Sequence, residues 1–189
     1  MKTQRKLATV MVAFAMLIGT STLAQTKEKT VQVGGAPMYP SKNIVENAMN
    51  SKDHTTLVAA VKAAGLVETL QGKGPFTVFA PTNSAFAKLP KGTVETLLKP
   101  ENLKTLQTIL TYHVLAGKFS ATDIVAAIKS GNGKAEFKTI SGGKLYASMS
   151  GKDVILMDEN GGKSKVTIAD VNQSNGVIHV VDAVVTPKS

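Results

Sequence analysis

A nearly continuous apolar run near the C-terminus limits what this chain can fold into. Residues 177–185 are apolar except for His179 and Asp182. A strand that is apolar on both faces has to be covered on both faces, so we expect this segment to be a central strand of a sheet. Polar side chains inside such a strand require hydrogen-bond partners. We therefore predict that His179 and Asp182 are hydrogen-bonded and structural.

The rest of the chain predicts helices first and strands afterwards. A second apolar run, residues 76–80, lies between two prolines and predicts a buried strand. Helical spacing and capping residues predict helices over residues 43–50, 54–64, 83–89, 93–98, 100–111 and 121–130. Glycine-rich turns separate predicted strands at residues 136–140, 144–150, 153–157, 164–169 and 177–185. This order indicates a single α+β domain with a mixed or antiparallel sheet.

Short polar residues mark where several of these elements begin. Thr82 and Asn83 follow the strand at residues 76–80, and we expect both to satisfy free amide groups at the start of the next helix. Asp53 is the expected cap of the helix before that strand. Asn175 and Gly176 predict a tight turn ahead of the last strand. All of these are interpreted as residues that determine the fold.

The N-terminal segment has the features of an export signal. Residues 1–24 combine a basic start with an apolar run of twelve, residues 7–18, and small residues before Gln25. We predict cleavage after Ala24; the alternative is an uncleaved N-terminal anchor. Residues 25–40 contain paired glycines and two prolines and are expected to form a flexible leader. The folded domain is then expected over residues 41–188. After cleavage of the signal, we predict that no membrane-spanning segment remains.

Composition excludes several kinds of chemistry. The chain has no Cys, so it has no disulfide, no thiolate nucleophile and no thiolate zinc ligand. Arg5 is its only arginine and lies in the predicted signal, which argues against nucleic acid as a partner. The three histidines lack metal-ligand spacing, and residues 158–162 match a hairpin turn better than a calcium loop. We expect no cofactor and no metal site.

Three blocks of sequence carry a family resemblance. Residues 74–86 read GPFTVFAPTNSAF, residues 106–119 read LQTILTYHVLAGKF, and residues 174–187 read SNGVIHVVDAVVTP. In this order and at this spacing, the chain resembles a fasciclin domain from about residue 41 to residue 187. The resemblance implies N-terminal helices packed on a wedge of mixed or antiparallel β-sheet.

The same resemblance points to two pairs of candidate partner-binding residues. Tyr112 and His113 occupy the segment that is implicated in receptor binding in the fasciclin family. Asp170 and Val171 match the position of an Asp-Ile adhesion motif of some animal relatives, with Val in place of Ile. The alternative interpretation is structural for both pairs: a hydrogen-bonded His with a half-buried Tyr, and an ordinary strand end.

These features lead to a functional prediction with two alternatives. We expect a secreted, periplasmic or extracellular, non-enzymatic fasciclin protein that acts as an adhesion or matrix-interaction module. Its partner would be a cell-surface or envelope protein or polysaccharide, and the chain would be a monomer. The first alternative is a periplasmic binder of a small apolar or lipid-like ligand, which requires an apolar pocket of ~300–1,000 Å³. The second is an unrecognised hydrolase, which requires clustered acidic or imidazole groups in a cleft.

Overall fold

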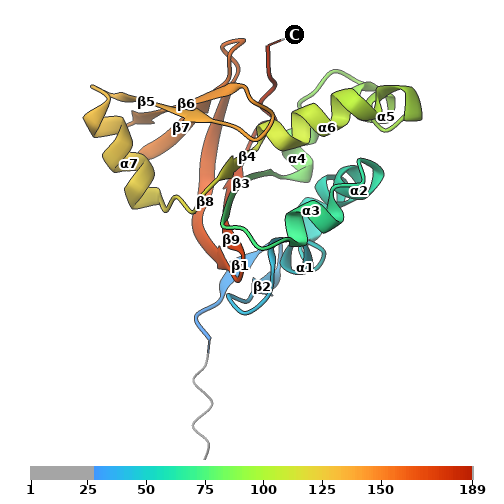
Figure 1. Ribbon diagram of the computed structural model, residues 1–189, viewed down its shortest axis with the longest axis horizontal. Helices are drawn as coiled ribbons and strands as arrows, with labels where there is room; N and C mark the ends of the chain where they lie inside the picture. Colours follow the sequence, from blue (N-terminus) through green and yellow to red (C-terminus); the bar gives the residue numbers. More distant parts are fainter. Residues whose placement is uncertain (1–27, 189) are drawn as a thin grey trace, which may run out of the picture.

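The computed structural model describes residues 28–188. Its main feature is a mixed seven-stranded sheet in the order β4-β3-β9-β8-β7-β6-β5 (Figure 1). A separate hairpin pairs β1 with β2. The strands are β1 Val31–Val33, β2 Ala36–Met38, β3 Phe76–Pro81, β4 Val114–Ala116, β5 Lys134–Lys138, β6 Lys144–Ser150, β7 Asp153–Met157, β8 Lys163–Gln173 and β9 Gly176–Val181.

Helices occupy most of the first half of the domain. Most are a single turn or two, and α2, α6 and α7 are the longer ones. The α-helices are α1 Ile44–Ala48, α2 Thr55–Ala63, α3 Val67–Gln71, α4 Asn83–Ala87, α5 Thr93–Leu97, α6 Leu103–Tyr112 and α7 Ala121–Ser130. Two 3-10 turns, η1 Lys52–His54 and η2 Pro100–Asn102, precede α2 and α6. The predicted α+β class, a single domain with helices before a mixed sheet, is confirmed.

The strand β9 is the centre of the sheet, as its sequence predicts. It pairs in parallel with β3 and antiparallel with β8, and all six of its residues are buried. The other pairs of neighbouring strands are antiparallel. The two outer margins of the sheet approach each other, because Leu115 of β4 forms a bridge with Thr139 directly after β5. The sheet therefore curls into a wedge.

Two apolar cores lie on either side of β3 and β9. The first packs α1, α2, α3 and α6 against these strands, with Val45, Val61 and Ile178 among its buried residues. The second fills the inside of the wedge and is closed by α7, with Phe79 and Leu156 wholly buried. Figure 1 shows α7 against the β5–β7 half of the sheet and the other helices at the opposite side of the molecule. The outer face of β5–β8 is left open.

The prediction of a flexible leader over residues 25–40 is wrong for its second half. Strands β1 and β2 form a hairpin within it, and Val33 and Met38 are buried in the first core. Gly34 and Gly35 both have positive φ, which is the backbone conformation of a two-residue hairpin turn. Glycines that suggested flexibility therefore form a tight turn, and the folded part begins near Val31.

The N-terminal prediction cannot be compared with this fold. The proposed signal, residues 1–24, and the start of the leader lie outside the described residues. Within residues 28–188, no helix has both the length and the apolar composition required to cross a membrane.

Candidate functional site

Tyr112 lies at the end of α6 and is completely buried. Its hydroxyl donates a hydrogen bond to the Lys144 carbonyl at 2.5 Å and accepts one from the Glu159 N–H at 3.3 Å. Burial raises the pKa of Tyr112 to about 12, so the phenol stays protonated. The side chain therefore connects α6 to the start of β6 and to the β7–β8 turn. The sequence placed the helix end at Thr111, but α6 includes Tyr112.

His113 follows Tyr112 and is 3% exposed. Its Nε2 accepts a hydrogen bond from the Val185 N–H at 3.1 Å, which assigns the proton to Nδ1. Nδ1–H then donates to the Ile109 carbonyl at 2.8 Å. Burial lowers the pKa of His113 to about 4, so the ring is neutral near pH 7. The ring thereby fastens the C-terminal segment after β9 to helix α6.

The Tyr112–His113 pair therefore makes its polar contacts inside the molecule. Both rings are enclosed, and each of their polar atoms has a partner within the chain. This arrangement matches the structural interpretation of the pair. Partner binding by these two side chains stays a prediction, and it requires a change of conformation that exposes them.

Asp170 and Val171 lie at an irregularity inside β8 rather than at a strand end. The pairing of β8 with β9 shifts register between Ile168 and Val171, and Asp170 has a φ of 57°. The Asp170 carboxylate accepts a hydrogen bond from Ala121 N–H, in the first turn of α7, at 2.7 Å. Val171 is 0% exposed. The bulge thus holds α7 against the sheet, and the adhesion role of this pair stays a prediction.

Thr82 and Asn83 cap two different helices. The Thr82 hydroxyl accepts from Ala85 N–H and caps α4, as predicted. Asn83 was expected to cap the same helix, but its Oδ1 accepts from Thr56 N–H at 3.0 Å, in the first turn of α2. The expected cap of α2, Asp53, makes no such bond: His54 occupies the N-cap position of α2 and has no capping bond of its own. A residue 27 positions away supplies the cap.

The remaining predicted structural residues all make specific internal contacts. Asn175 accepts from Ile44 N–H and donates to the carbonyls of Leu70 and Gly72, which joins α1 to α3. A side chain at Gly176 would collide with the Phe76 carbonyl, so only glycine fits there.

His179 and Asp182 are both hydrogen-bonded, as predicted, but only His179 lies in the buried strand; Asp182 follows β9 and is partly exposed. The His179 ring accepts from Asp170 N–H, donates to the Phe119 carbonyl and stacks on Phe79. Asp182 accepts from Lys165 N–H at 2.8 Å and pairs with Lys88 at 3.2 Å. Partial burial acts to raise the pKa of Asp182, but these two contacts outweigh it and hold the pKa below its usual value.

The open face of β5–β8 is a surface that these internal contacts leave unused. Its residues follow from the strand register, since directly paired residues share a face. Across the strands, one row is Glu136, Tyr146, Met157 and Lys163, and the next is Lys134, Ser148, Ile155 and Lys165. Lys138 and Lys144 form a pair at one end, and Ser150 and Asp153 at the other. We call these twelve residues the open face.

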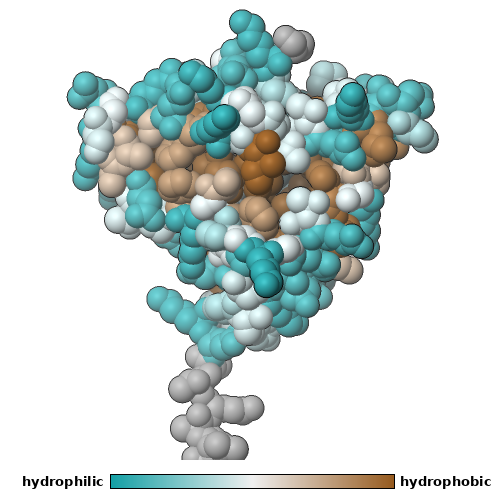
Figure 2. All heavy atoms as spheres, viewed as in Figure 1, coloured by the Kyte–Doolittle hydropathy of each residue, from teal (hydrophilic) through white to brown (hydrophobic). Residues whose placement is uncertain are grey.

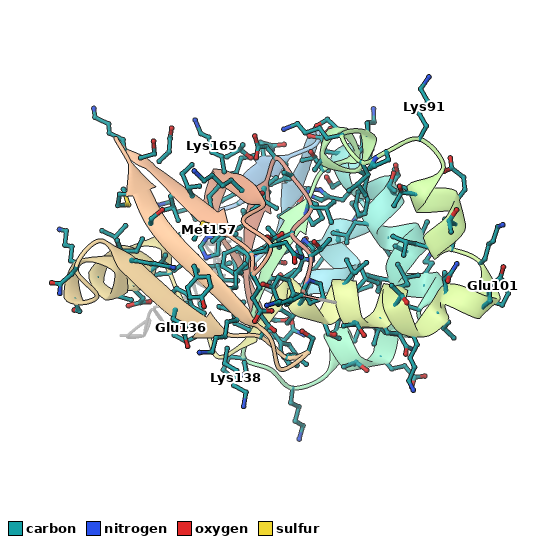
Figure 3. The ribbon with its side chains drawn as sticks, turned by 90° about the horizontal axis from the view of Figure 1, so that it is seen from above. Lys91, Glu101, Glu136, Lys138, Met157 and Lys165 are labelled. Atoms are coloured by element: carbon teal, nitrogen blue, oxygen red, sulfur yellow. The ribbon has the colours of Figure 1, made fainter. Side chains whose placement is uncertain are left out.

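The open face is rich in lysine and has a less polar centre. Figure 3 looks onto it and shows Met157 between Lys165 on one side and Glu136 and Lys138 on the other. All five of its lysines are exposed, whereas Tyr146, Ile155 and Met157 are half-buried. The upper rim of the molecule in Figure 2 is mostly hydrophilic, and an apolar band lies below it, from the side of α7 to the side of α6.

Sequence reasoning missed this face. A local signal existed, because charged residues alternate with other residues at positions 134, 136 and 138, which are Lys, Glu and Lys, and lysines recur at positions 163 and 165; alternate residues of a strand share a face. The missing information was which strands lie side by side and which side is uncovered.

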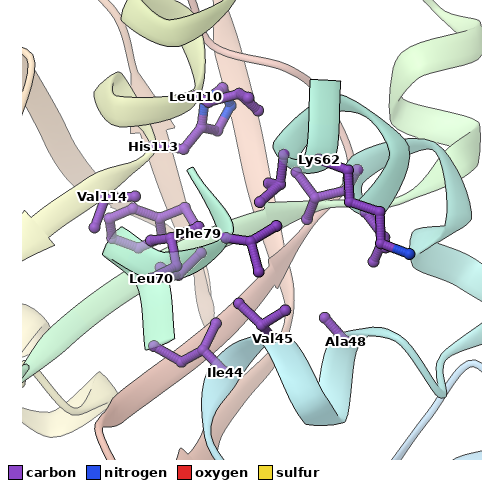
Figure 4. A pocket seen from close by; sticks show the side chains of 14 residues that line it. Ile44, Val45, Ala48, Lys62, Leu70, Phe79, Leu110, His113 and Val114 are labelled. Atoms are coloured by element: carbon purple, nitrogen blue, oxygen red, sulfur yellow. The ribbon is translucent and has the colours of Figure 1, made fainter. Parts of the chain in front are cut away.

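Two apolar cavities lie among the helices. The larger, about 110 Å³, lies between α4, α5, α6 and the C-terminal segment. The other, about 40 Å³, lies between α1, α2, α3 and β3, with Ile44, Val45 and Leu70 in its wall (Figure 4). Both are smaller than the ~300–1,000 Å³ of typical ligand sites, so they do not favour the apolar-ligand alternative. In the described part of the chain, no cluster of three or more His, Asp or Glu side chains is placed to hold a metal ion.

Comparison with solved structures defines the class of fold. The chain superposes on a FAS1 domain pair from the insect cell adhesion molecule Fasciclin I with a TM-score of 0.68 at 16% identity. The match covers 82% of this chain and 57% of that one, so the helices and the wedge together form a FAS1-type domain.

Sequence comparison gives the family. The sequence model of the fasciclin domain family matches residues 52–187, and the chain belongs to this family. It is 44% identical to Protein sll1483 of Synechocystis sp. over 99% of both chains. It is also 31% identical to the cell surface glycolipoprotein MPB83 of Mycobacterium bovis, over 92% of this chain and 73% of that protein. The resemblance seen in the three sequence blocks is therefore confirmed.

Proposed function

We propose that this protein is an exported, non-catalytic interaction module that attaches to components of the cell surface or envelope. Family membership supports this, since similar proteins include one named for the cell surface and one described as a cell adhesion molecule. The predicted signal over residues 1–24 supports export. Attachment by a folded, rigid surface distinguishes this proposal from binding of a small ligand inside the domain.

One structural observation carries the proposal. In residues 28–188, the rings of His113 and His179 and the Tyr112 hydroxyl are used internally, because they bond to backbone groups of the fold. By contrast, four neighbouring strands present one whole face that no helix covers (Figure 3). A broad, regular and exposed surface on a stabilised scaffold suits recognition of a macromolecule better than catalysis.

The test measures where the protein is found in the cell and whether the folded protein attaches to envelopes. Antibody detection in fractionated cells of the source organism should find the protein in the envelope or medium, shortened at its N-terminus. Purified protein beginning at Gln25 should sediment with washed envelopes, and heat-unfolded protein should not do so in the same saturable way. Full-length protein confined to the cytoplasm, or folded protein that stays in the supernatant at low salt, would overturn the proposal.

A further inference from the structure

We propose that the open face binds an acidic polysaccharide, held by lysines at both margins and by a less polar floor between them. This inference rests on the proposed function and names the chemistry of the partner. Five of the twelve residues of the face are lysines and two are acidic, so the face is positively charged. A surface of one dominant sign attracts ligands of the opposite sign and orients them before contact.

The two acidic residues are already neutralised. Glu136 pairs with Lys144 at 3.0 Å and Asp153 pairs with Lys165 at 2.6 Å. Lys134, Lys138 and Lys163 make no ion pair within the described residues. Lys134 lies over the Tyr146 ring, 3.8 Å from its centre. Three ammonium groups are therefore available to an anionic ligand without breaking an ion pair.

The positions of these lysines fit an extended polymer. Lys134 and Lys138 lie on β5, and Lys163 lies on β8, three strands away. Neighbouring strands are ~4.8 Å apart, so the two margins are separated by ~14 Å, and residues 134 and 138 by a similar distance along β5. A single small anion could reach only one lysine at a time. A chain with a negative group on successive sugar units could contact all three.

The floor between the margins suits sugar units. A hollow of about 490 Å³ lies on the face, and Ser148, Ser150, Ile155 and Met157 contribute to its wall. Asp182 also lines this hollow, and its carboxylate is paired with Lys88 at 3.2 Å. Serine hydroxyls both donate and accept hydrogen bonds, which matches the hydroxyl groups of a sugar. The half-buried Ile155 and Met157 can pack on the less polar side of a sugar ring.

The same features disfavour a protein or a membrane as the partner. The centres of protein interfaces are enriched in aromatic residues and arginine and depleted in lysine, and this face has five lysines and no arginine. Membrane-surface binding needs large apolar side chains that project beyond the charges. Here the apolar residues are half-buried and the lysines are exposed, so a flat membrane would meet only the charges.

The test compares two triple variants of the Gln25–Ser189 protein. The first is Lys134→Gln/Lys138→Gln/Lys163→Gln on the open face. The control is Lys91→Gln/Lys99→Gln/Lys104→Gln on the helical side, which makes the same change in net charge at three exposed lysines. The probe is a labelled polygalacturonate oligosaccharide of about ten units, with neutral dextran and phosphatidylglycerol vesicles as comparisons. Circular dichroism and urea unfolding should show that both variants keep the fold, because all six side chains are exposed.

We expect the wild-type protein to bind polygalacturonate and not dextran, with affinity that falls steeply as salt is raised. The open-face variant should lose about tenfold in affinity, in line with three exposed charge contacts, and the control variant less than about twofold. Equal losses in both variants, no polygalacturonate binding at low salt, or binding to the vesicles alone would each overturn the inference. If the open-face variant still sediments with envelopes as the wild type does, the inference fails while the proposed function stands.

Discussion

Tyr112 shows how one polar atom can hold together parts of the chain that are far apart in sequence. Its hydroxyl bonds to the backbone of Lys144 and of Glu159, which are 32 and 47 residues away. The ring is surrounded by the second core, together with Phe79, Leu145 and Val181. The residue therefore contributes both apolar burial and two hydrogen bonds to the contact between α6 and the sheet.

Removal of the Tyr112 hydroxyl should lower stability without disrupting the fold. Tyr112→Phe leaves the Lys144 carbonyl and the Glu159 N–H, both in part-buried hydrogen bonds, without this partner, so we expect a loss of about 1–2 kcal/mol in the free energy of unfolding. Tyr146→Phe is the matched control, since that hydroxyl makes no hydrogen bond within the described residues, and it should cost less than about 0.5 kcal/mol. Urea unfolding at pH 7 measures both, and equal values would contradict this role for Tyr112.

Burial of Tyr112 also changes how partner binding by the Tyr112–His113 pair has to be tested. Alanine at either position would remove core packing and internal hydrogen bonds, and a large-to-small change at a buried aromatic residue costs about 3–5 kcal/mol. Loss of binding in such a variant would therefore report loss of folding. Only a variant whose free energy of unfolding is unchanged can separate partner contact from stability.

At the scale of secondary structure, the ends of the helices depend on other elements. The first turn of α2 is capped by Asn83, which also donates to the Lys52 carbonyl at 2.8 Å. The first turn of α7 is bonded both by its own capping box, Ser120 and Asp123, and by Asp170 from the bulge of β8. Each contact fixes the position of a helix relative to a strand or a neighbouring helix.

The two candidate caps of α2 can be compared directly. Asn83→Ala should lower the free energy of unfolding by about 1–2 kcal/mol, because the amide groups at the helix start lose their acceptor. Asp53→Ala removes an exposed residue that does not cap the helix and should change stability by less than about 0.5 kcal/mol. Thermal or urea unfolding measures the difference. A larger effect of Asp53→Ala would show that the local cap dominates after all.

At the scale of the whole molecule, all three histidines are buried, and burial lowers the pKa of each. His113 has a pKa of about 4, and His54 and His179 are also shifted below the value of 6.5 that they have when unfolded. Between these values the unfolded chain binds protons that the folded chain does not. The contribution of the three neutral histidines to the free energy of unfolding should therefore be fully present above pH 6.5 and decrease as the pH falls towards 4.

The expected decrease in the free energy of unfolding at low pH is large for His113 alone. Between pH 7 and pH 4.5, His113 alone should lower the free energy of unfolding by roughly 2–3 kcal/mol, and the other two histidines act in the same direction. Urea unfolding at a series of pH values measures the slope. His113→Gln, which offers a donor and an acceptor but does not titrate, should have a shallower slope. A wild-type stability that is constant from pH 7 to pH 4.5 would contradict the assignment of neutral, buried histidines.

Local sequence determined much of the architecture, because turns, caps and alternation act over a few residues. Strands β6 and β7 begin and end at the predicted residues, the capping box of α7 forms, and the apolar run at residues 177–185 begins as the central strand β9. This strand ends at Val181, and the residues after it form the segment that His113 fastens. The three sequence blocks were also sufficient to indicate the family.

Only the tertiary structure decided which groups are enclosed and which surface is open. The partners of Tyr112, Asn83 and Asp170 lie 27 to 49 residues away in sequence, and no local pattern specifies such contacts. The hairpin of β1 and β2 is ordered for the same reason, since Val33 and Met38 pack into a core made by later helices. The lysines of β5 and β8 share a face only because the strands between them pair in one register. Burial and alignment of this kind depend on the assembly of the whole domain, and they determine which residues are left for a partner.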